Sequence, residues 1–311
     1  MRVPARALAL ACLLVAAPLS AVEEPDFEKA ARDVEIELAR RSFERMLHYA
    51  IRLKTVSEPI RAEGAVLCGD RLAPVLGLIV TDRWELPWAL HEPAADRFEV
   101  DGRTRVLWVM PGFAADRSGL QPRDVIVSVD GVKVEDAASF RVYDPEGADP
   151  MRFVVQRDGS YRTLEVENVP GCYSPADVII DSRINAIADG NFMLFFTGFL
   201  RHFPDDDHLA LVVGHELAHN ILGHVGRDAG PELEAEADYM GAYLAARAGY
   251  DVRDAEAVFR EFGLLFFYAS GPNSRRSHPT SPSRVLALRE TVSEIEAKIA
   301  GEQRLEPDYW D

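Results

Sequence analysis

The chain has 311 residues, 48% of them hydrophobic, which is enough apolar sequence for two compact domains with separate cores. Its formal net charge of −17 at pH 7 argues against nucleic-acid binding, because a protein that neutralises phosphates needs an excess of basic side chains. The charge otherwise indicates a well-solvated surface and says nothing about catalysis.

Residues 1–21 read as a secretory signal peptide. Arg2 and Arg6 form a short basic start, residues 7–17 are an apolar run, and residues 18–21 offer a cleavage site. The run is shorter than a membrane-spanning helix needs. We therefore expect a cleaved, soluble protein in the periplasm or outside the cell, and an uncleaved N-terminal membrane anchor is the less favoured alternative.

Export would place Cys68 and Cys172 in an oxidising compartment, where an even number of cysteines indicates pairing. A bridge between them would close a loop of about 100 residues and contribute roughly 4–5 kcal/mol in the chain-entropy model. Two buried, unpaired thiols are the alternative, and the sequence leaves both open.

Residues 26–53 show helical periodicity. Their apolar residues share one face, with charged residues between them: Ala30, Val34, Leu38, Leu47 and Ile51. We expect this helix, within an N-terminal segment of residues 22–71, to pack on the domain formed by residues 171–303.

Short β-type runs separated by turns fill residues 72–170. Asp-Gly dipeptides typical of hairpins lie between the runs, which are 76–80, 104–109, 125–129, 151–156 and 161–166. The central segment PGFAADRSGLQPRDVIVSVDGVKV, residues 111–134, resembles the PDZ domains found in bacterial proteases. The resemblance implies an inserted, partly open β-barrel with a groove between a strand and a helix.

By this resemblance the carboxylate loop and groove strand are Leu76, Gly77, Leu78 and Ile79, and residues 136–143 form the facing helix. An extended peptide could add to the exposed strand, with its C-terminal carboxylate bound by backbone N–H groups of the loop. The alternative is a module that only buttresses the enzyme. The long connection 84–96 favours that alternative if it covers the groove.

The segment LALVVGHELAHNILGH, residues 209–224, has the periodicity of a helix that begins after three aspartates, which can cap it. His215 and His219 are four residues apart and project from one face, with Glu216 beside them. This is the HExxH arrangement of two zinc ligands and a general base. A core helix with buried histidines is the alternative, but burying His, Glu and His together is costly without a metal ion.

A second helix is predicted over residues 232–248, with Pro231 at its first position and Gly249 after its end. Four motifs follow in order: HELAH, ExxAD at 234–238, AGYD at 248–251 and HPTSPSR at 278–284. This order resembles the zinc metallopeptidases that include the CAAX prenyl protease, the heat-shock membrane protease HtpX and periplasmic quality-control peptidases. The resemblance implies an α+β protein whose peptidase domain, residues 171–303, is a mostly helical, gluzincin-like zincin with a small sheet.

The resemblance also assigns roles to residues. It implies one Zn²⁺ ion held by His215, His219 and Glu234, with Glu216 as general base and then as proton donor to the leaving amine. Asp238, one turn after Glu234, is expected to hydrogen-bond a ligand histidine. Residues 191–196 are expected to form the edge strand against which an extended substrate is laid.

Three further residues keep open roles. Glu236 is a fallback ligand, because the chain between His219 and Glu234 is short. His224 lies five residues after His219 and points away from the metal face of a continuous helix, so it is expected to be structural or to support a ligand. His278 is expected near the site, where it stabilises an oxyanion, binds zinc in a resting state or anchors its loop.

The C-terminal helix from Ser283 carries an apolar stripe that favours core packing over a dimer seam: Val285, Leu288, Val292, Ile295 and Ile299. Residues 304–311 form an acidic tail, expected to be loose.

The sequence therefore predicts a zinc endopeptidase of the cell envelope that cleaves unfolded or extended protein segments and is recruited or regulated through its PDZ-like module. Its partners would be protein or peptide substrates, with membrane proximity at most. The alternative is a weakly active or inactive peptidase-fold protein with a binding or chaperone-like role in quality control.

Overall fold

The computed structural model of the protein describes residues 27–141, 147, 149–227, 230–269 and 282–308. The predicted signal peptide and His278 lie outside these residues. The chain divides into two compact units, Met1–Leu38 and Ala39–Asp311. Helix α1 (Phe27–Glu63) begins in the first unit and continues into the second.

Helix α1 extends ten residues beyond its predicted end and contains Pro59. Burial explains the extension, because Leu53, Val56 and Ile60 belong to the peptidase core. Earlier in the helix, Phe43 and Leu47 pack instead against the segment 86–107. The helix therefore contacts more than the catalytic domain on which it was expected to pack.

The PDZ-like module is an antiparallel sheet with the strand order β2-β3-β4-β6-β7, and β5 pairs with β4. Its strands are β2 (Leu78–Thr81), β3 (Arg105–Val109), β4 (Val125–Val129), β5 (Val132–Lys133), β6 (Met151–Arg157) and β7 (Ser160–Val166). Two short helices, α3 (Ala114–Arg117) and α4 (Ala137–Arg141), pack on it. The sheet does not close, which confirms the predicted mixed architecture with an open barrel.

The connection between β2 and β3 forms η2 (Arg83–Glu85), η3 (Trp88–Leu90) and α2 (His91–Phe98). Its apolar side chains Leu86, Leu90 and Ala94 cluster with Phe43 and Leu47 of α1. The connection was predicted to be able to cover the peptide groove. It packs on α1 instead, because that is where its apolar side chains are buried.

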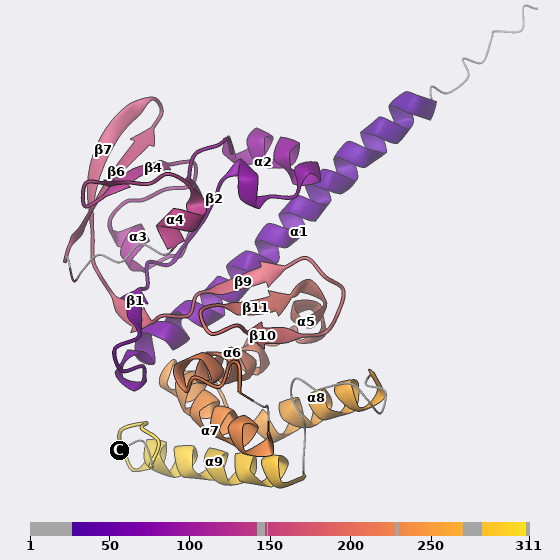
Figure 1. Cartoon of the computed structure of the whole chain (residues 1–311), viewed down its shortest axis with the longest axis vertical. Helices are drawn as coiled ribbons and strands as arrows, with labels where there is room; N and C mark the ends of the chain where they lie inside the picture. The colour runs from indigo at the N-terminus through magenta and orange to yellow at the C-terminus, as the bar shows by residue number, and fades with distance from the viewer. Residues whose placement is uncertain (1–26, 142–146, 148, 228–229, 270–281, 309–311) are drawn as a thin grey trace, which may run out of the picture. The chain divides into compact units, whose positions relative to one another are not determined.

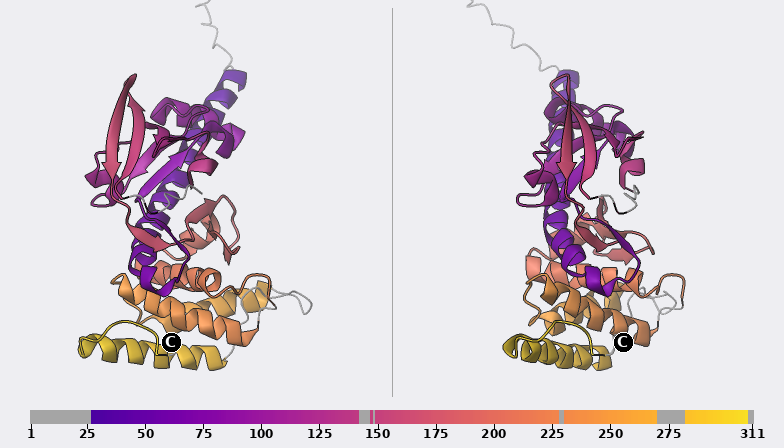
Figure 2. Two further views of the ribbon diagram at one scale, coloured as in Figure 1. Left: turned by 60° about the vertical axis from the view of Figure 1, so that its left-hand side comes forward. Right: turned by 90° about the vertical axis from the view of Figure 1, so that its left-hand side faces the viewer.

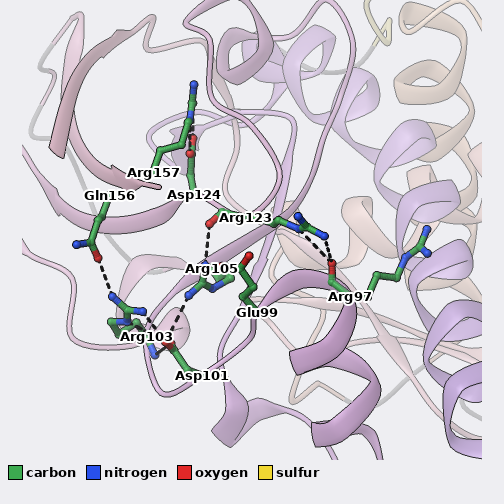
Figure 3. A network of polar contacts seen from close by, with 9 residues as sticks. All are labelled: Arg97, Glu99, Asp101, Arg103, Arg105, Arg123, Asp124, Gln156 and Arg157. Atoms are coloured by element: carbon green, nitrogen blue, oxygen red, sulfur yellow. Dashed lines mark hydrogen bonds and ion pairs between the residues drawn. The ribbon is translucent and has the colours of Figure 1, made fainter. Parts of the chain in front are cut away.

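A polar network joins this connection to the sheet (Figure 3). Arg105 is 5% exposed, and its guanidinium donates to the carbonyl oxygen of Arg123 at 2.9 Å. Arg123 in turn donates to the carbonyl oxygen of Arg97, in the last turn of α2. Nearby, Arg157 forms a two-point ion pair with buried Asp124 at 2.6 and 2.7 Å. Arg157 neutralises the buried carboxylate of Asp124, and the contacts of Arg105 and Arg123 with backbone carbonyls link the connection to the sheet.

The module enters and leaves the fold at one place. Strand β1 (Leu72–Pro74) pairs antiparallel with β8 (Pro170–Cys172), and Cys68 and Cys172 are joined by a disulfide with a Cα–Cα distance of 5.5 Å. The bonded cysteines are 104 residues apart in sequence. The bridge thus closes the loop that contains the whole module.

Replacing both cysteines by serine should lower the free energy of unfolding by roughly 4–5 kcal/mol, because the unfolded chain regains the entropy of this loop. Urea unfolding of both proteins, with and without reductant, measures the effect. The parent should fall to the variant's midpoint when reduced, and the variant should not respond to reductant. A parent whose midpoint is the same in both conditions would contradict the role of the bridge.

In the described part of the chain, the peptidase region contains a three-stranded sheet and five helices. Figures 1 and 2 show how they are arranged. The strands are β9 (Ala176–Ile179), β10 (Ala186–Ala188) and β11 (Met193–Phe196), and the helices are α5 (Thr197–His202), α6 (Asp206–Ile221), α7 (Pro231–Arg247), α8 (Ala255–Ala269) and α9 (Pro282–Ala300). Helix α7 lies between α6 and α9. Helix α8 was not predicted.

Two expectations for this region are wrong. Strand β11 is central, since it pairs with β10 on one side and β9 on the other, so residues 191–196 cannot offer a free edge to a substrate. The tail is not loose up to Asp308. Arg247 donates to the carbonyl oxygen of Leu305 at 2.9 Å, and Lys298 donates to that of Glu306 at 2.7 Å.

Candidate metal centre

Helix α6 begins at a capped end and carries two histidines on its buried side. The carboxylate of Asp205 accepts hydrogen bonds from the backbone N–H groups of Asp207 and His208, at 2.9 and 3.1 Å, as the sequence predicted. His215, Glu216 and His219 all lie in the interior, with 3%, 2% and 7% exposure. The helix therefore holds three polar side chains away from solvent.

Glu234 reaches the same point from the first turn of α7 and is 1% exposed. Its carboxylate oxygens lie 3.7 Å from Nε2 of His215 and 3.5 Å from Nε2 of His219, and the two Nε2 atoms are 3.0 Å apart. A tetrahedral zinc ion with bonds of about 2.0–2.1 Å holds its ligand atoms about 3.3–3.4 Å apart. The three residues fit a zinc ion, and the structure brings together the ligand set that the sequence predicted.

Glu236, the fallback ligand, is not part of this group. Its side chain is 58% exposed, and its carboxylate lies 3.2 Å from Nε2 of His224. On a helix, residues two apart point in different directions, so Glu234 and Glu236 cannot face the same site.

Close contact of two helix backbones sets the position of Glu234. A Cβ atom added to Gly214 of α6 would lie 2.2 Å from the carbonyl oxygen of Gly241 in α7, and one added to Gly241 would lie 2.6 Å from the backbone nitrogen of His215. Only glycine at both positions permits this approach. The chain between His219 and Glu234 is short, but this close crossing of the helices still brings Glu234 opposite the histidines.

Asp238 lies beside His215, one of the two histidines that the resemblance offered as its partner. Its carboxylate lies 2.9 Å from Nδ1 of His215 and accepts two hydrogen bonds from the guanidinium of Arg284, both 2.8 Å long. Arg284 also lies 3.0 Å from the carboxylate of Glu234. Burial works to lower the pKa of Arg284, but hydrogen bonding to Asp238 and the charges of Asp238 and Glu234 outweigh it and raise the pKa.

Arg284 is the last residue of the HPTSPSR motif, and the sequence predicted no role for it. A signal for it exists in the sequence, because Arg284 precedes Leu288 by four residues and so shares the buried stripe of α9. A buried arginine requires anionic partners, and the acidic ExxAD motif supplies them.

His224 supports His219 from beyond the helix end. Helix α6 ends at Ile221, and Gly223 adopts a left-handed conformation (φ +66°) that turns the chain back. Nδ1 of His224 then lies 3.0 Å from Nδ1 of His219. Burial lowers the pKa of His224 despite the opposing charge of Glu236. His224 thus contacts His219 because the chain turns back at Gly223, and not because of helical spacing.

Two further side chains frame the centre. The ring of Phe259, from α8, lies 5.3 Å from that of His215 between centroids. Asn220, which is 1% exposed, donates to Oγ of Ser174 at 2.7 Å and accepts from the backbone N–H of Gly190 at 2.7 Å. Asn220 therefore ties the end of α6 to the loops beside β9 and β11.

This geometry defines a class of protein: an HExxH centre completed by a carboxylate from the following helix, preceded by a PDZ-like module. Residues 166–233 and 231–292 match the model of Peptidase family M48, and residues 105–144 match that of the PDZ domain. These matches, to peptidase family M48 over the C-terminal part of the chain and to the PDZ domain over its central part, support the resemblance at family level.

The curated relatives include metalloendopeptidases. The chain is 30% identical over 126 residues to the mitochondrial metalloendopeptidase OMA1 of Arabidopsis thaliana, covering 30% of this chain and 26% of that protein. It is 27% identical over 158 residues to the human mitochondrial metalloendopeptidase OMA1, covering 34% of this chain and 30% of that protein. The chain therefore spans less than a third of the length of these relatives.

Similar solved structures contain PDZ domains. One is the HtrA3 PDZ domain bound to a phage-derived ligand, with 21% identity, a TM-score of 0.25 and coverage of 32% of this chain and 88% of that chain. Another is the HtrA-type protease AlgW with a decapeptide, with 24% identity, a TM-score of 0.25 and coverage of 32% and 30%. TM-scores this low do not establish a shared fold, so the PDZ assignment depends on the strand order and the match over residues 105–144.

The predicted localisation requires correction. Both curated relatives are named as mitochondrial proteins, which contradicts the expected periplasmic or secreted location with a cleaved signal peptide. Within the part of the chain that the structure describes, none of the helices combines the length and hydrophobicity needed to span a bilayer.

Replacing Gly241 by alanine should lower the free energy of unfolding by about 1–3 kcal/mol, because the new methyl group must push α7 away from α6. The same shift should weaken zinc binding, since Glu234 moves with α7. Gly102→Ala is the control, because its Cβ would meet the nearest atom at 3.4 Å. Urea unfolding and zinc titration measure both effects. A Gly241→Ala protein as stable as the control would contradict the crossing.

Replacing Arg284 by leucine should cost about 3–5 kcal/mol, because two buried carboxylates lose their shared cation. Arg284→Lys should fall between this variant and the parent, since an ammonium group cannot form the two-point contact with Asp238. Arg289→Lys, at an exposed pair with Glu256, is the matched control and should change stability little. Urea unfolding measures all three. If Arg284→Lys is as stable as Arg289→Lys, the two-point contact has no structural importance.

Proposed function

We propose that the protein is a zinc-dependent endopeptidase that hydrolyses peptide bonds in unfolded or extended protein segments. The observation that carries the proposal is the convergence of His215, His219 and Glu234, whose ligand atoms lie within 4.8 Å of one another beside Glu216. Metallopeptidases use this donor set of two imidazoles and one carboxylate.

A zinc ion held by these residues would supply Lewis acidity, which lowers the pKa of a water and polarises a peptide carbonyl. Glu216 follows His215 in the same helical turn and acts as the general base that accepts the proton of the attacking water. It then returns that proton to the leaving amine. Its burial keeps the carboxylate away from bulk solvent, so the proton passes between defined partners.

The proposed preference for extended segments has support in the sheet. Strand β10 packs beside α6, and in the described part of the chain it pairs with β11 alone. Its outer edge therefore offers backbone groups with which an extended substrate can pair. Strand β10, and not residues 191–196, is therefore the edge strand against which we propose that an extended substrate is laid.

We propose that the PDZ module recruits protein or peptide segments. Strand β2 is an edge of its sheet, and a pocket lies along it, lined by Leu78 and Val80 of β2 and by Phe140 of α4. Arg141 also lines the pocket and donates to the carbonyl oxygen of Val80 at 3.2 Å. A bound peptide would have to displace this contact to pair with β2 at Val80.

Digestion of casein tests the peptidase activity. The zinc-loaded parent should cleave casein, while Glu216→Gln and a chelated sample should lose essentially all activity, because each lacks the base or the metal. Glu290→Gln, at an exposed position of α9, is the control and should match the parent. No cleavage by a folded, zinc-loaded parent would contradict the peptidase and favour a role in binding without cleavage.

A further inference from the structure

The two histidines of the centre are supported in different ways. Asp238 lies directly against Nδ1 of His215, at 2.9 Å. Behind His219 stands a second imidazole, His224, and behind that the carboxylate of Glu236. The chain of three groups runs from the buried centre to a glutamate whose side chain is 58% exposed.

A hydrogen bond between two imidazole nitrogens needs one N–H donor and one lone-pair acceptor. Nδ1 of His219 and Nδ1 of His224 are 3.0 Å apart, so one of them carries the shared proton. The geometry alone does not say which. The group at the far end of this series of hydrogen bonds determines which nitrogen carries the proton.

That far end is a carboxylate, which when ionised only accepts hydrogen bonds. Oε2 of Glu236 lies 3.2 Å from Nε2 of His224, so Nε2 of His224 carries the proton and donates it. A neutral His224 then has a lone pair on Nδ1, which accepts from Nδ1–H of His219. His219 is left with its lone pair on Nε2, the atom 3.5 Å from the carboxylate of Glu234.

We propose that His224 and Glu236 are positioning residues that fix His219 in the tautomer required to bind the metal ion. The inference rests on the proposed metal site. Its physical basis is burial of the two imidazoles, because the side chains of His219 and His224 are 9% and 3% exposed and water cannot readily replace the contact between them. Such partners behind a ligand histidine typically change metal affinity by about 10–100-fold.

The first experiment measures zinc affinity by competition with a chromophoric chelator, using the full chain stripped of metal. Glu236→Gln should raise the zinc dissociation constant about tenfold or more, because an amide can donate as well as accept and no longer fixes the direction of the chain. Glu236→Asp should recover part of the loss. Glu232→Gln removes the same charge from an exposed position on the same helix and should change the constant less than twofold.

The second experiment reads the tautomer itself. Long-range ¹H–¹⁵N spectra of the histidine rings in the metal-free protein should show His219 protonated on Nδ1 and His224 on Nε2. In Glu236→Gln the His219 signals should move towards a mixture of tautomers. Urea unfolding of the metal-free variants should give midpoints close to the parent, which separates tautomer control from loss of fold.

Three results would overturn the inference. Equal effects of Glu236→Gln and Glu232→Gln would leave only a general charge effect. Loss of zinc binding as complete as in Glu234→Gln would make Glu236 a ligand. Protonation of His219 on Nε2 in the metal-free parent would mean that the hydrogen bond between the two imidazoles runs in the opposite direction. If the parent bound no zinc, the metal site itself would fail, while the spectra would still test the tautomer.

Discussion

The candidate metal centre depends on the close contact between the backbones of α6 and α7 at Gly214 and Gly241. The approach is so tight that a methyl group on either residue would overlap the opposite backbone. It fixes how far α7 lies from the histidines, and so it fixes whether Glu234 can share a point with them. Two imidazoles from one helix would be an incomplete ligand set without this crossing.

The buried charges of the site follow from that arrangement. Two carboxylates of α7, Glu234 and Asp238, lie next to each other in the interior and would repel if unbalanced. Arg284 enters from α9 and contacts both, which joins α9 to α7 through one guanidinium. On the other side, His224 and Glu236 support His219 from outside α6. The proposed donor set is thus contacted from two directions by groups that are not part of it.

Much of the centre could be predicted from sequence because local spacing determines it. The four-residue interval between His215 and His219 places both on one face of any helix, and the capping aspartates fix where that helix begins. Contacts between distant segments could not be read in this way. The pairing of Gly214 with Gly241 depends on how the helices cross, and the central position of β11 depends on which strands flank it. Predicting the role of Arg284 required the position of its partner Asp238 as well as the burial pattern of α9.

The most direct test of this account is the crystal structure of the zinc-loaded protein with data collected on both sides of the zinc absorption edge. The account predicts one anomalous peak per chain, about 2 Å from Nε2 of His215, Nε2 of His219 and a carboxylate oxygen of Glu234. A peak bound by Glu236 in place of Glu234, or full zinc loading with no peak between α6 and α7, would contradict it.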